Sequence, residues 1–357
     1  MSFVKTGAFR GLNSDSDDVK IDSSGNVAIV NGNIVNKNLL INGGMNVWQR
    51  GTSQASIITA GYYTTDRWRT GGSGLGAFTQ SRSTDVPSGQ GFSYSLKMDC
   101  TTADASQAAS DNLNIQHRIE GQNLQHLLKG SSSAKKVTLS FWVKSNKTGT
   151  YIIELADVDN TRHICKAYTI DSASTWEKKE LTFDGDTTGA FDNDNASSLE
   201  ILWYLGVGSD RSSGTLATSW ATRTDANKAV GQVNLADSTS NEWYMTGCQL
   251  EVGENASGFE FEPYATTLQK CFRYFERNSN EMYFAPRSRT THTSNNFCTV
   301  FLKVSMRTAP TVFDVTTNNL TGHTVTRLSE THFMGEADAT SSSGTARYTA
   351  WKATAEL

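Results

Sequence analysis

Short segments in which apolar and polar residues alternate recur along most of this chain, and they constrain its fold more than any other feature. Clusters of Gly, Ser, Asn and Asp separate these segments, which span residues 92–98, 137–144, 149–155, 166–170, 176–183, 199–205 and 243–253. A period of two residues places successive side chains on opposite faces of a β-strand. Short strands joined by tight turns predict an antiparallel sandwich, and eight or more of them over roughly 230 residues suit a jelly roll.

The composition favours sheets with a large exposed surface. Hydrophobic residues make up 37% of the 357 residues, and only 4 prolines occur, so the turns depend on Gly, Asn and Asp. The mean hydropathy is −0.44. A net charge of −4 gives no long-range attraction for nucleic acid. The sequence contains no apolar run of 18 residues, so we expect no membrane insertion.

Two sequence features indicate the cellular compartment in which the protein is made. Polar sequence follows Met1 almost directly, without the apolar core of a signal peptide, so we expect synthesis in a cytosol without export. The five cysteines form no C-x-x-C pair, and their number is odd. We expect reduced, mostly buried thiols, and neither a zinc site nor a disulfide framework. These cysteines are Cys100, Cys165, Cys248, Cys271 and Cys298.

The pattern divides the chain into four parts. Alternating segments on both sides of Ser24, Gly25 and Asn26 predict a β-hairpin. Such a hairpin buries too little surface to be stable alone, so it needs another domain or other copies of itself. We expect an N-terminal hairpin for attachment or oligomerisation, a jelly-roll sandwich, a helical linker and a small C-terminal β domain, at residues 1–36, 37–265, 266–280 and 281–357.

Helix signals are sparse. Leu268, Cys271, Phe272 and Phe275 follow the i, i+3, i+4, i+7 spacing of one helix face, which predicts a helix over residues 266–277. Residues 115–128 fit either a second helix or a strand followed by a short helix. The overall expectation is an all-β fold with a short helix.

Several motifs resemble, in this order, those of a domain that recurs in phage tail-fibre and other appendage proteins. They lie at residues 38–51 with 65–68, at 248–277, and at 306–312, the last of which is similar to a strand entry of the small β domain that often follows. The resemblance covers about residues 38–315. The N-terminal hairpin is similar to tail-fibre repeats that associate as trimers. The sandwich resembles the jelly roll of carbohydrate-binding modules.

The resemblance implies a non-enzymatic phage virion appendage, assembled in the host cytoplasm as a homotrimer. Its partners would be other virion proteins and a glycan on the host surface. The chain lacks the coiled coil or repeated shaft of long fibres, so a tail fibre and a compact accessory protein both stay open. Three alternatives remain: a polysaccharide-degrading tailspike, a capsid or head decoration protein without receptor binding, and a secreted carbohydrate-binding module.

Aromatic residues are the candidate ligand contacts. A sugar ring needs a flat apolar surface for its C–H face, with polar groups nearby for its hydroxyls. Aromatic side chains at alternating strand positions also belong to the core, and that interpretation stays open for each of them. The residue least typical of a core lies in the polar stretch at 209–225. The candidates are Trp203, Tyr204, Trp176, Tyr168 and, in that stretch, Trp220.

Acidic residues suggest two further kinds of site. The densest cluster consists of Asp184, Asp186, Asp192 and Asp194, and it fits either a calcium site or a solvated turn. No other cofactor is expected. Glycoside hydrolysis needs two carboxyl groups across the bond. Five carboxyl groups lie in or beside strands and can form such a pair: Asp66, Glu154, Glu180, Glu200 and Glu251. Asp66 better fits a structural ion pair with Arg67, next to Trp68.

Overall fold

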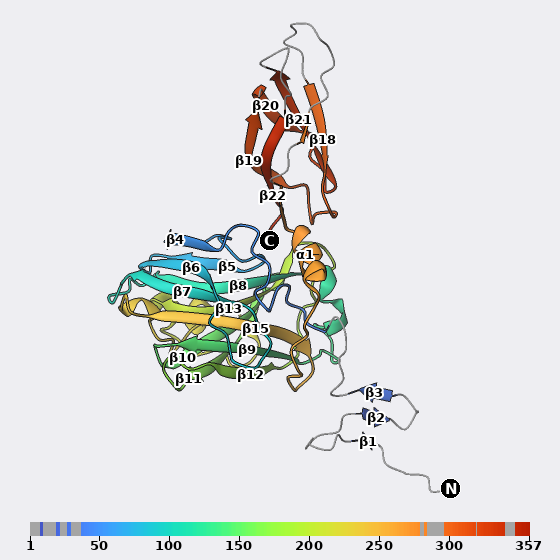
Figure 1. Cartoon of the computed structure of the whole chain (residues 1–357). Coiled ribbons are helices and arrows are strands. Elements are labelled where there is room, and N and C mark those ends of the chain that lie inside the picture. The colour runs from blue at the N-terminus through green and yellow to red at the C-terminus, as the bar shows by residue number, and fades with distance from the viewer. Residues whose placement is uncertain are drawn as a thin grey trace.

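The computed structural model describes residues 37–278, 296–318, 320–339 and 347–357, together with the strand residues 8–9, 19–21, 27–29 and 282–283. Strands dominate this part of the chain, and two six-stranded antiparallel sheets form its largest unit (Figure 1). We call them the β8 sheet and the β9 sheet. The prediction of an all-β antiparallel sandwich of jelly-roll type, with a short helix, is confirmed.

The chain crosses between the two sheets several times. In spatial order the β8 sheet contains β14 (Ala221–Thr222), β11 (Arg162–Ile170), β10 (Gly149–Asp157), β13 (Ser197–Val207), β8 (Asn112–Glu120) and β5 (Arg69–Ser73). The β9 sheet contains β12 (Glu177–Phe183), β9 (Val137–Ser145), β15 (Glu242–Val252), β7 (Ser95–Thr102), β6 (Ala77–Ser83) and β4 (Ser53–Ile57). Three consecutive pairs, β6 and β7, β10 and β11, and β13 and β14, stay within one sheet. Neighbours such as β10 and β11 are joined by tight turns, as the segment spacing predicts.

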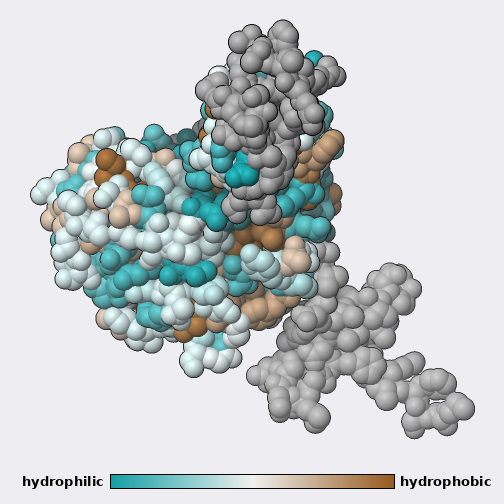
Figure 2. Space-filling view, turned by 45° about the horizontal axis from the view of Figure 1, so that its top comes forward, coloured by the Kyte–Doolittle hydropathy of each residue, from teal (hydrophilic) through white to brown (hydrophobic). Residues whose placement is uncertain are grey.

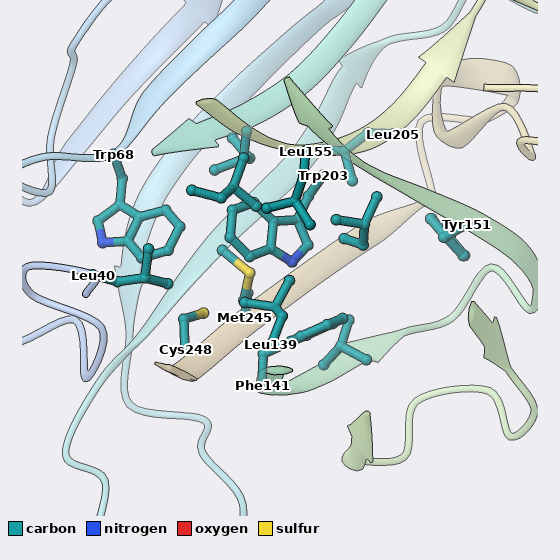
Figure 3. Packing of buried hydrophobic residues seen from close by; sticks show 14 of the residues in the cluster. Leu40, Trp68, Leu139, Phe141, Tyr151, Leu155, Trp203, Leu205, Met245 and Cys248 are labelled. Atoms are coloured by element: carbon teal, nitrogen blue, oxygen red, sulfur yellow. The ribbon is translucent and has the colours of Figure 1, made fainter. Parts of the chain in front are cut away.

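The core lies between the two sheets. Trp68, Trp203 and Trp243 are fully buried there, and the Trp68 and Trp203 ring centroids lie 5.3 Å apart. Figure 3 shows Trp203 surrounded by aliphatic and aromatic side chains from both sheets. Because strand side chains alternate, Trp203 points inward while its neighbour Tyr204 points to the outer face of the β8 sheet.

A long connection covers part of that outer face. Residues 208–241, which we call the strap, link β13 to β15 and contain short 3₁₀ turns at Ser209–Arg211, Asp225–Asn227 and Leu235–Asp237. Ala229 of the strap packs on Ile152 and Leu202 of the sheet. The strand residues beneath the strap include an apolar cluster, which the strap keeps from water.

The N-terminal hairpin is confirmed in its paired strands. Strand β2 (Val19–Ile21) pairs antiparallel with β3 (Val27–Ile29), and Val19 lies opposite Ile29. Strand β1 (Ala8–Phe9) extends this small sheet. The turn at residues 24–26 lies outside the described residues, and oligomerisation through the segment stays a prediction.

The helix differs from its predicted bounds. Helix α1 spans Tyr264–Phe272 and is followed by strand β16 (Phe275–Asn278). Phe275 therefore belongs to a strand, because it pairs with Thr354 of β22. The segment at 115–128 contains β8 and then 3₁₀ turns at Gly121–Asn123 and Gln125–Leu127, which is the second of the two expected arrangements.

The C-terminal part forms two further sheets. One contains β16, β22 (Arg347–Thr354), β17 (Met282–Tyr283) and β19 (Thr311–Asn318), and the other contains β18 (Asn296–Phe301), β21 (His332–Ala339) and β20 (Leu320–Thr326). Phe333 and Trp351 are buried between them, with ring centroids 5.2 Å apart. The hydrophobic cluster here is smaller than that of the sandwich.

Buried ion pairs join this unit to the sandwich. Arg273, after α1, donates to both carboxylate oxygens of Glu120 at 2.7 Å. The buried Arg67 pairs with Glu356 and lies against the Tyr274 ring. The expected ion pair between Asp66 and Arg67 is therefore wrong, because the two side chains have different partners. The Asp66 carboxylate pairs with the Arg50 guanidinium instead, at 3.6 Å.

The surface agrees with the low mean hydropathy. Figure 2 shows a face on which hydrophilic residues dominate and hydrophobic ones form separate small patches. No helix in the described ranges is long and apolar enough to cross a membrane.

Candidate functional site

Two of the expected aromatic platforms are buried. Trp203 is 0% exposed and Tyr204 is 1% exposed, so neither offers a ring face to a ligand. Trp203 belongs to the core between the sheets (Figure 3), and Tyr204 lies beneath the strap. The prediction of surface platforms at these positions is therefore wrong. Both residues lie on β13, one face of which packs on the core while the strap covers the other. Tyr168, 5% exposed, is a core residue too.

The Tyr204 phenol belongs to a buried polar network instead. It donates to Glu154 at 2.7 Å, and Arg223 of the strap donates to the same carboxylate at 2.9 Å. His163 Nδ1 lies 3.0 Å from Glu154 Oε1. Burial alone would raise the pKa of Glu154, but the hydrogen bond from His163 and the charge of Arg223 outweigh it and lower that pKa to about 2.

Glu154 is thus unsuited to donate a proton in glycoside hydrolysis. A general acid needs a raised pKa and contact with the substrate. Glu154 is held ionised and is 0% exposed. Glu200 lies on the neighbouring strand opposite Ala156, two residues from Glu154, and pairs with Arg118 at 2.8 Å. Because Glu154 is fully buried, the two carboxylates cannot act together on a bound glycan.

Trp176 is half-buried at the edge of the β9 sheet. Its indole Nε1 donates to Asp85 at 2.8 Å. The Lys144 ammonium lies 5.6 Å from its ring centroid and 4.4 Å from that of Tyr244. Its ring is therefore part of a packed row of alternating aromatic and charged groups on the outer face of this sheet.

Trp220 lies at a pocket. It immediately precedes β14, whose pairing with β11 fixes it at the edge of the β8 sheet. Its indole Nε1 donates to the Asp184 carbonyl oxygen at 2.6 Å, which orients the ring. A pocket opens beside it, lined by Leu127, Lys129, Ala134, Lys135, Val137, Leu155, Asp184, Gly185, Asp186, Phe191, Leu199 and Trp220. The structure thus brings together three predicted residues, Trp220, Asp184 and Asp186.

The pocket has an apolar floor and a polar rim. Leu155, Leu199 and Val137 are core residues, whereas Asp184 and Lys135 are exposed. The surrounding loops are held by backbone contacts: Gly130 N donates to the Asp186 carbonyl at 2.8 Å. A Cβ on Gly185 would lie 2.4 Å from the Ala134 carbonyl oxygen, so the close approach of the two loops requires glycine there.

A lysine occupies the place where a metal ion was expected. The Lys129 ammonium donates to the carbonyl oxygens of Thr188 and Gly189 at 2.9 and 2.7 Å. It also pairs with Asp157 and, at 3.2 Å, with Asp186. We call these four oxygen acceptors the oxygen cage. Arg162 holds Asp186 from the other side, at 2.6 Å, so these carboxylates already have cationic partners.

The four predicted metal ligands do not converge. In the described part of the chain, no three His, Cys, Asp or Glu side chains are grouped to hold a metal ion. Asp192 and Asp194 are exposed, and Asp194 accepts a hydrogen bond from its own loop, from Ala196 N at 2.9 Å. The expected grouping of Asp184, Asp186, Asp192 and Asp194 is wrong because the loop directs these side chains to different partners.

Replacing Lys129 with methionine should destabilise the sandwich. The Lys129→Met variant keeps the aliphatic chain but removes the ammonium, which leaves Asp157 without a cation and costs about 2 kcal/mol. Urea denaturation followed by circular dichroism measures this. The control is Lys135→Met, on the exposed rim, for which we expect a change within about 0.5 kcal/mol. Equal stability of the two variants would contradict a structural role for the oxygen cage.

Sequence reasoning missed Lys129 and Phe191. The Lys129 ammonium lies 5.2 Å from the Phe191 ring centroid and 5.5 Å from that of Trp220. Neither residue belongs to a recognisable motif, and their loops are far apart in the chain. The available signal was the acidic cluster itself, because buried carboxylates require cations and a lysine supplies one without a metal.

Comparisons with known proteins give distant structural similarities. No protein-family model and no curated protein matches the chain. The enzymatically active domain of tailspike protein 4 from bacteriophage CBA120 is similar over 61% of this chain and 22% of its own length, with 14% identity and a TM-score of 0.33. A putative sugar-binding protein from Bacteroides thetaiotaomicron is similar over 60% of this chain and 100% of its own length (11% identity, TM-score 0.33). A family 11 carbohydrate-binding module from Clostridium thermocellum, solved with a mixed-linked tetrasaccharide, is similar over 58% of this chain and 98% of its own length (11% identity, TM-score 0.29).

Proposed function

We propose that this protein is a non-enzymatic phage virion appendage that binds a glycan on the host cell surface through the Trp220 pocket. It is made in the host cytoplasm, assembles as a homotrimer and contacts other virion proteins. The order of the sequence motifs, from residues 38–51 to 306–312, supports the appendage role. The pocket supports the binding role.

The single observation that carries glycan binding is the oriented, half-buried ring of Trp220 over an apolar floor. The hydrogen bond from its indole nitrogen to Asp184 fixes the ring without using its face. Core side chains form the floor, and charged groups stand at the rim. A ring face beside polar groups is the arrangement that takes the C–H face of a sugar and then its hydroxyls.

The same residues favour binding over catalysis. Asp186 and Lys129 at the pocket are already paired with each other, and Glu154 is sealed under the strap. A hydrolase needs two free carboxyl groups across an open space. The alternative of a head decoration protein without receptor binding predicts the same virion location but no glycan affinity, so the two differ in one measurable property.

The virion role is tested on particles. Antibodies raised against the full-length chain should label purified virions of the phage that encodes it, seen by immunogold electron microscopy. Labelling confined to the tail supports an attachment appendage, and labelling over the head supports the decoration alternative. Particles that carry none of the protein would contradict both.

A further inference from the structure

A second polar surface lies on the outer face of the β8 sheet, at the opposite edge from Trp220. Arg69 is on the edge strand β5, Gln116 and Arg118 are on β8, and Glu200 is on β13 (Figure 1). Arg69 pairs in register with Gln116, and Arg118 with Glu200. Since Gln116 and Arg118 are two residues apart, all four side chains belong to one face. We call Arg69 and Arg118 the arginine edge.

The two guanidinium groups share one neutral acceptor. Arg69 Nη1 donates to Gln116 Oε1 at 2.9 Å, and Arg118 Nη2 lies 3.4 Å from the same oxygen. Arg118 also pairs with Glu200 at 2.8 Å. Among the residues that the structure describes, Arg69 has no carboxylate within ion-pair distance, so a half-buried cation stands beside a second cation without an anion of its own.

This charge arrangement is unfavourable in the free protein. Burial and the neighbouring Arg118 guanidinium lower the pKa of Arg69, and each of these effects opposes a positive charge. An oxyanion bridging the two guanidinium groups would offset the repulsion between them. By contrast, the buried Arg67 and the half-buried Arg273 each have a carboxylate partner, Glu356 and Glu120.

Two tyrosines stand beside the arginine edge. Gly61 and Thr70 exchange backbone hydrogen bonds of 2.9 Å, which places Tyr62 and Tyr63 next to β5. Both are half-buried. Burial raises the pKa of Tyr62 to about 12, so its phenol stays a neutral donor over the whole physiological range.

An oxygen acceptor already lies at one end of this surface. Arg118 Nη1 donates to the Leu357 main-chain oxygen at 2.7 Å, and the Tyr62 hydroxyl lies 3.3 Å from that oxygen. The donors of Arg118 and Tyr62 therefore converge on one point. Arg69 shares the Gln116 acceptor with Arg118 and has no other side-chain acceptor in the described residues.

We infer that the arginine edge binds an oxyanion, and that in the proposed function this oxyanion is the carboxylate of an acidic sugar. The planar guanidinium fork matches a carboxylate with two parallel hydrogen bonds. A sulfate ester presents the same chemistry. Assignment to a glycan rests on the proposed function, whereas oxyanion binding does not.

The experiment is calorimetric titration of the full-length chain with three oligosaccharides of equal length: an oligogalacturonate, a sulfated oligomer and a neutral oligomer. We expect an acidic oligomer to bind and the neutral one to bind at least about tenfold more weakly. Arg69→Gln should weaken acidic binding at least about tenfold and reduce its salt dependence. Arg82→Gln is the matched control, because Arg82 is exposed over the Tyr94 ring and also has no carboxylate partner in the described residues.

Each outcome of the titrations has its own interpretation. Binding of the galacturonate oligomer alone identifies a carboxylate site, and binding of the sulfated oligomer alone identifies a sulfate ester site. Equal binding of neutral and acidic oligomers, no binding of either acidic oligomer, or equal losses in the two variants would overturn the inference. Circular dichroism of both variants excludes unfolding as the cause. A failure of Trp220→Ala to affect glycan binding would weaken the proposed function and leave this result untouched.

Discussion

Replacing Trp203 with alanine should destabilise the sandwich by about 3–5 kcal/mol, the range for truncating a fully buried aromatic side chain. Trp203 is 0% exposed, and its ring lies against Trp68 and Phe141 from both sides of the core (Figure 3). The small residue leaves a cavity that the close-packed sheets cannot fill by relaxing. Urea denaturation followed by far-ultraviolet circular dichroism measures the loss.

Two further variants serve as controls for this measurement. Trp203→Phe retains a ring and should lose less, which keeps the measurement possible if the alanine variant fails to fold. Trp176→Ala removes a half-buried tryptophan at the sheet edge and should cost about 1 kcal/mol or less. If Trp203→Ala were as stable as Trp176→Ala, Trp203 would not be a core residue, and the surface platform originally expected there would be restored.

The second large effect concerns Glu154. Glu154→Ala should cost about 3–5 kcal/mol, because it leaves Arg223 without its buried partner and removes the acceptor of Tyr204. Since Arg223 belongs to the strap, the variant should also be cleaved faster within residues 208–241 in limited proteolysis. A double change, Glu154→Leu with Arg223→Met, should recover part of the stability, because it removes the charges together.

The same residue gives stability a defined pH dependence. The pKa of Glu154 is lowered from 4.5 to about 2 in the folded protein, so its contribution is present above about pH 4.5 and disappears as the pH falls through about 2. The depression corresponds to about 3 kcal/mol. Stability of the native protein should therefore fall more steeply between pH 4.5 and 2 than that of Glu154→Ala. Parallel pH profiles would contradict the network.

The sandwich was predictable because strand alternation is local. Segments such as 137–144 and 149–155 became β9 and β10 with small shifts at their ends. The same rule does not predict that Tyr204 is buried. Tyr204 points outward as alternation requires, but the strap covers it, and no local pattern predicts which distant loop covers a sheet face.

The candidate site was predictable only in part. Trp220 stood out because it interrupts a polar stretch, and the structure places it at a pocket. The acidic cluster indicated a cation, but its identity, the Lys129 ammonium, depends on a loop some 55 residues earlier in the chain that meets Asp186 only after folding. The sequence did not predict the arginine edge for the same reason, because only the pairing of β5 with β8 brings Arg69 and Arg118 together.

Glycan binding by the Trp220 pocket is tested most directly on an array of bacterial surface polysaccharides probed with the labelled full-length chain. The native protein should bind a subset of the glycans. Trp220→Ala should weaken that binding by about 1–2 kcal/mol, or roughly five- to thirtyfold, while Trp176→Ala retains it. Acidic glycans are compared separately, because the arginine edge is expected to bind them. Neutral-glycan binding that survives Trp220→Ala unchanged, or a native protein that binds no neutral glycan on the array, would contradict the pocket as the receptor site.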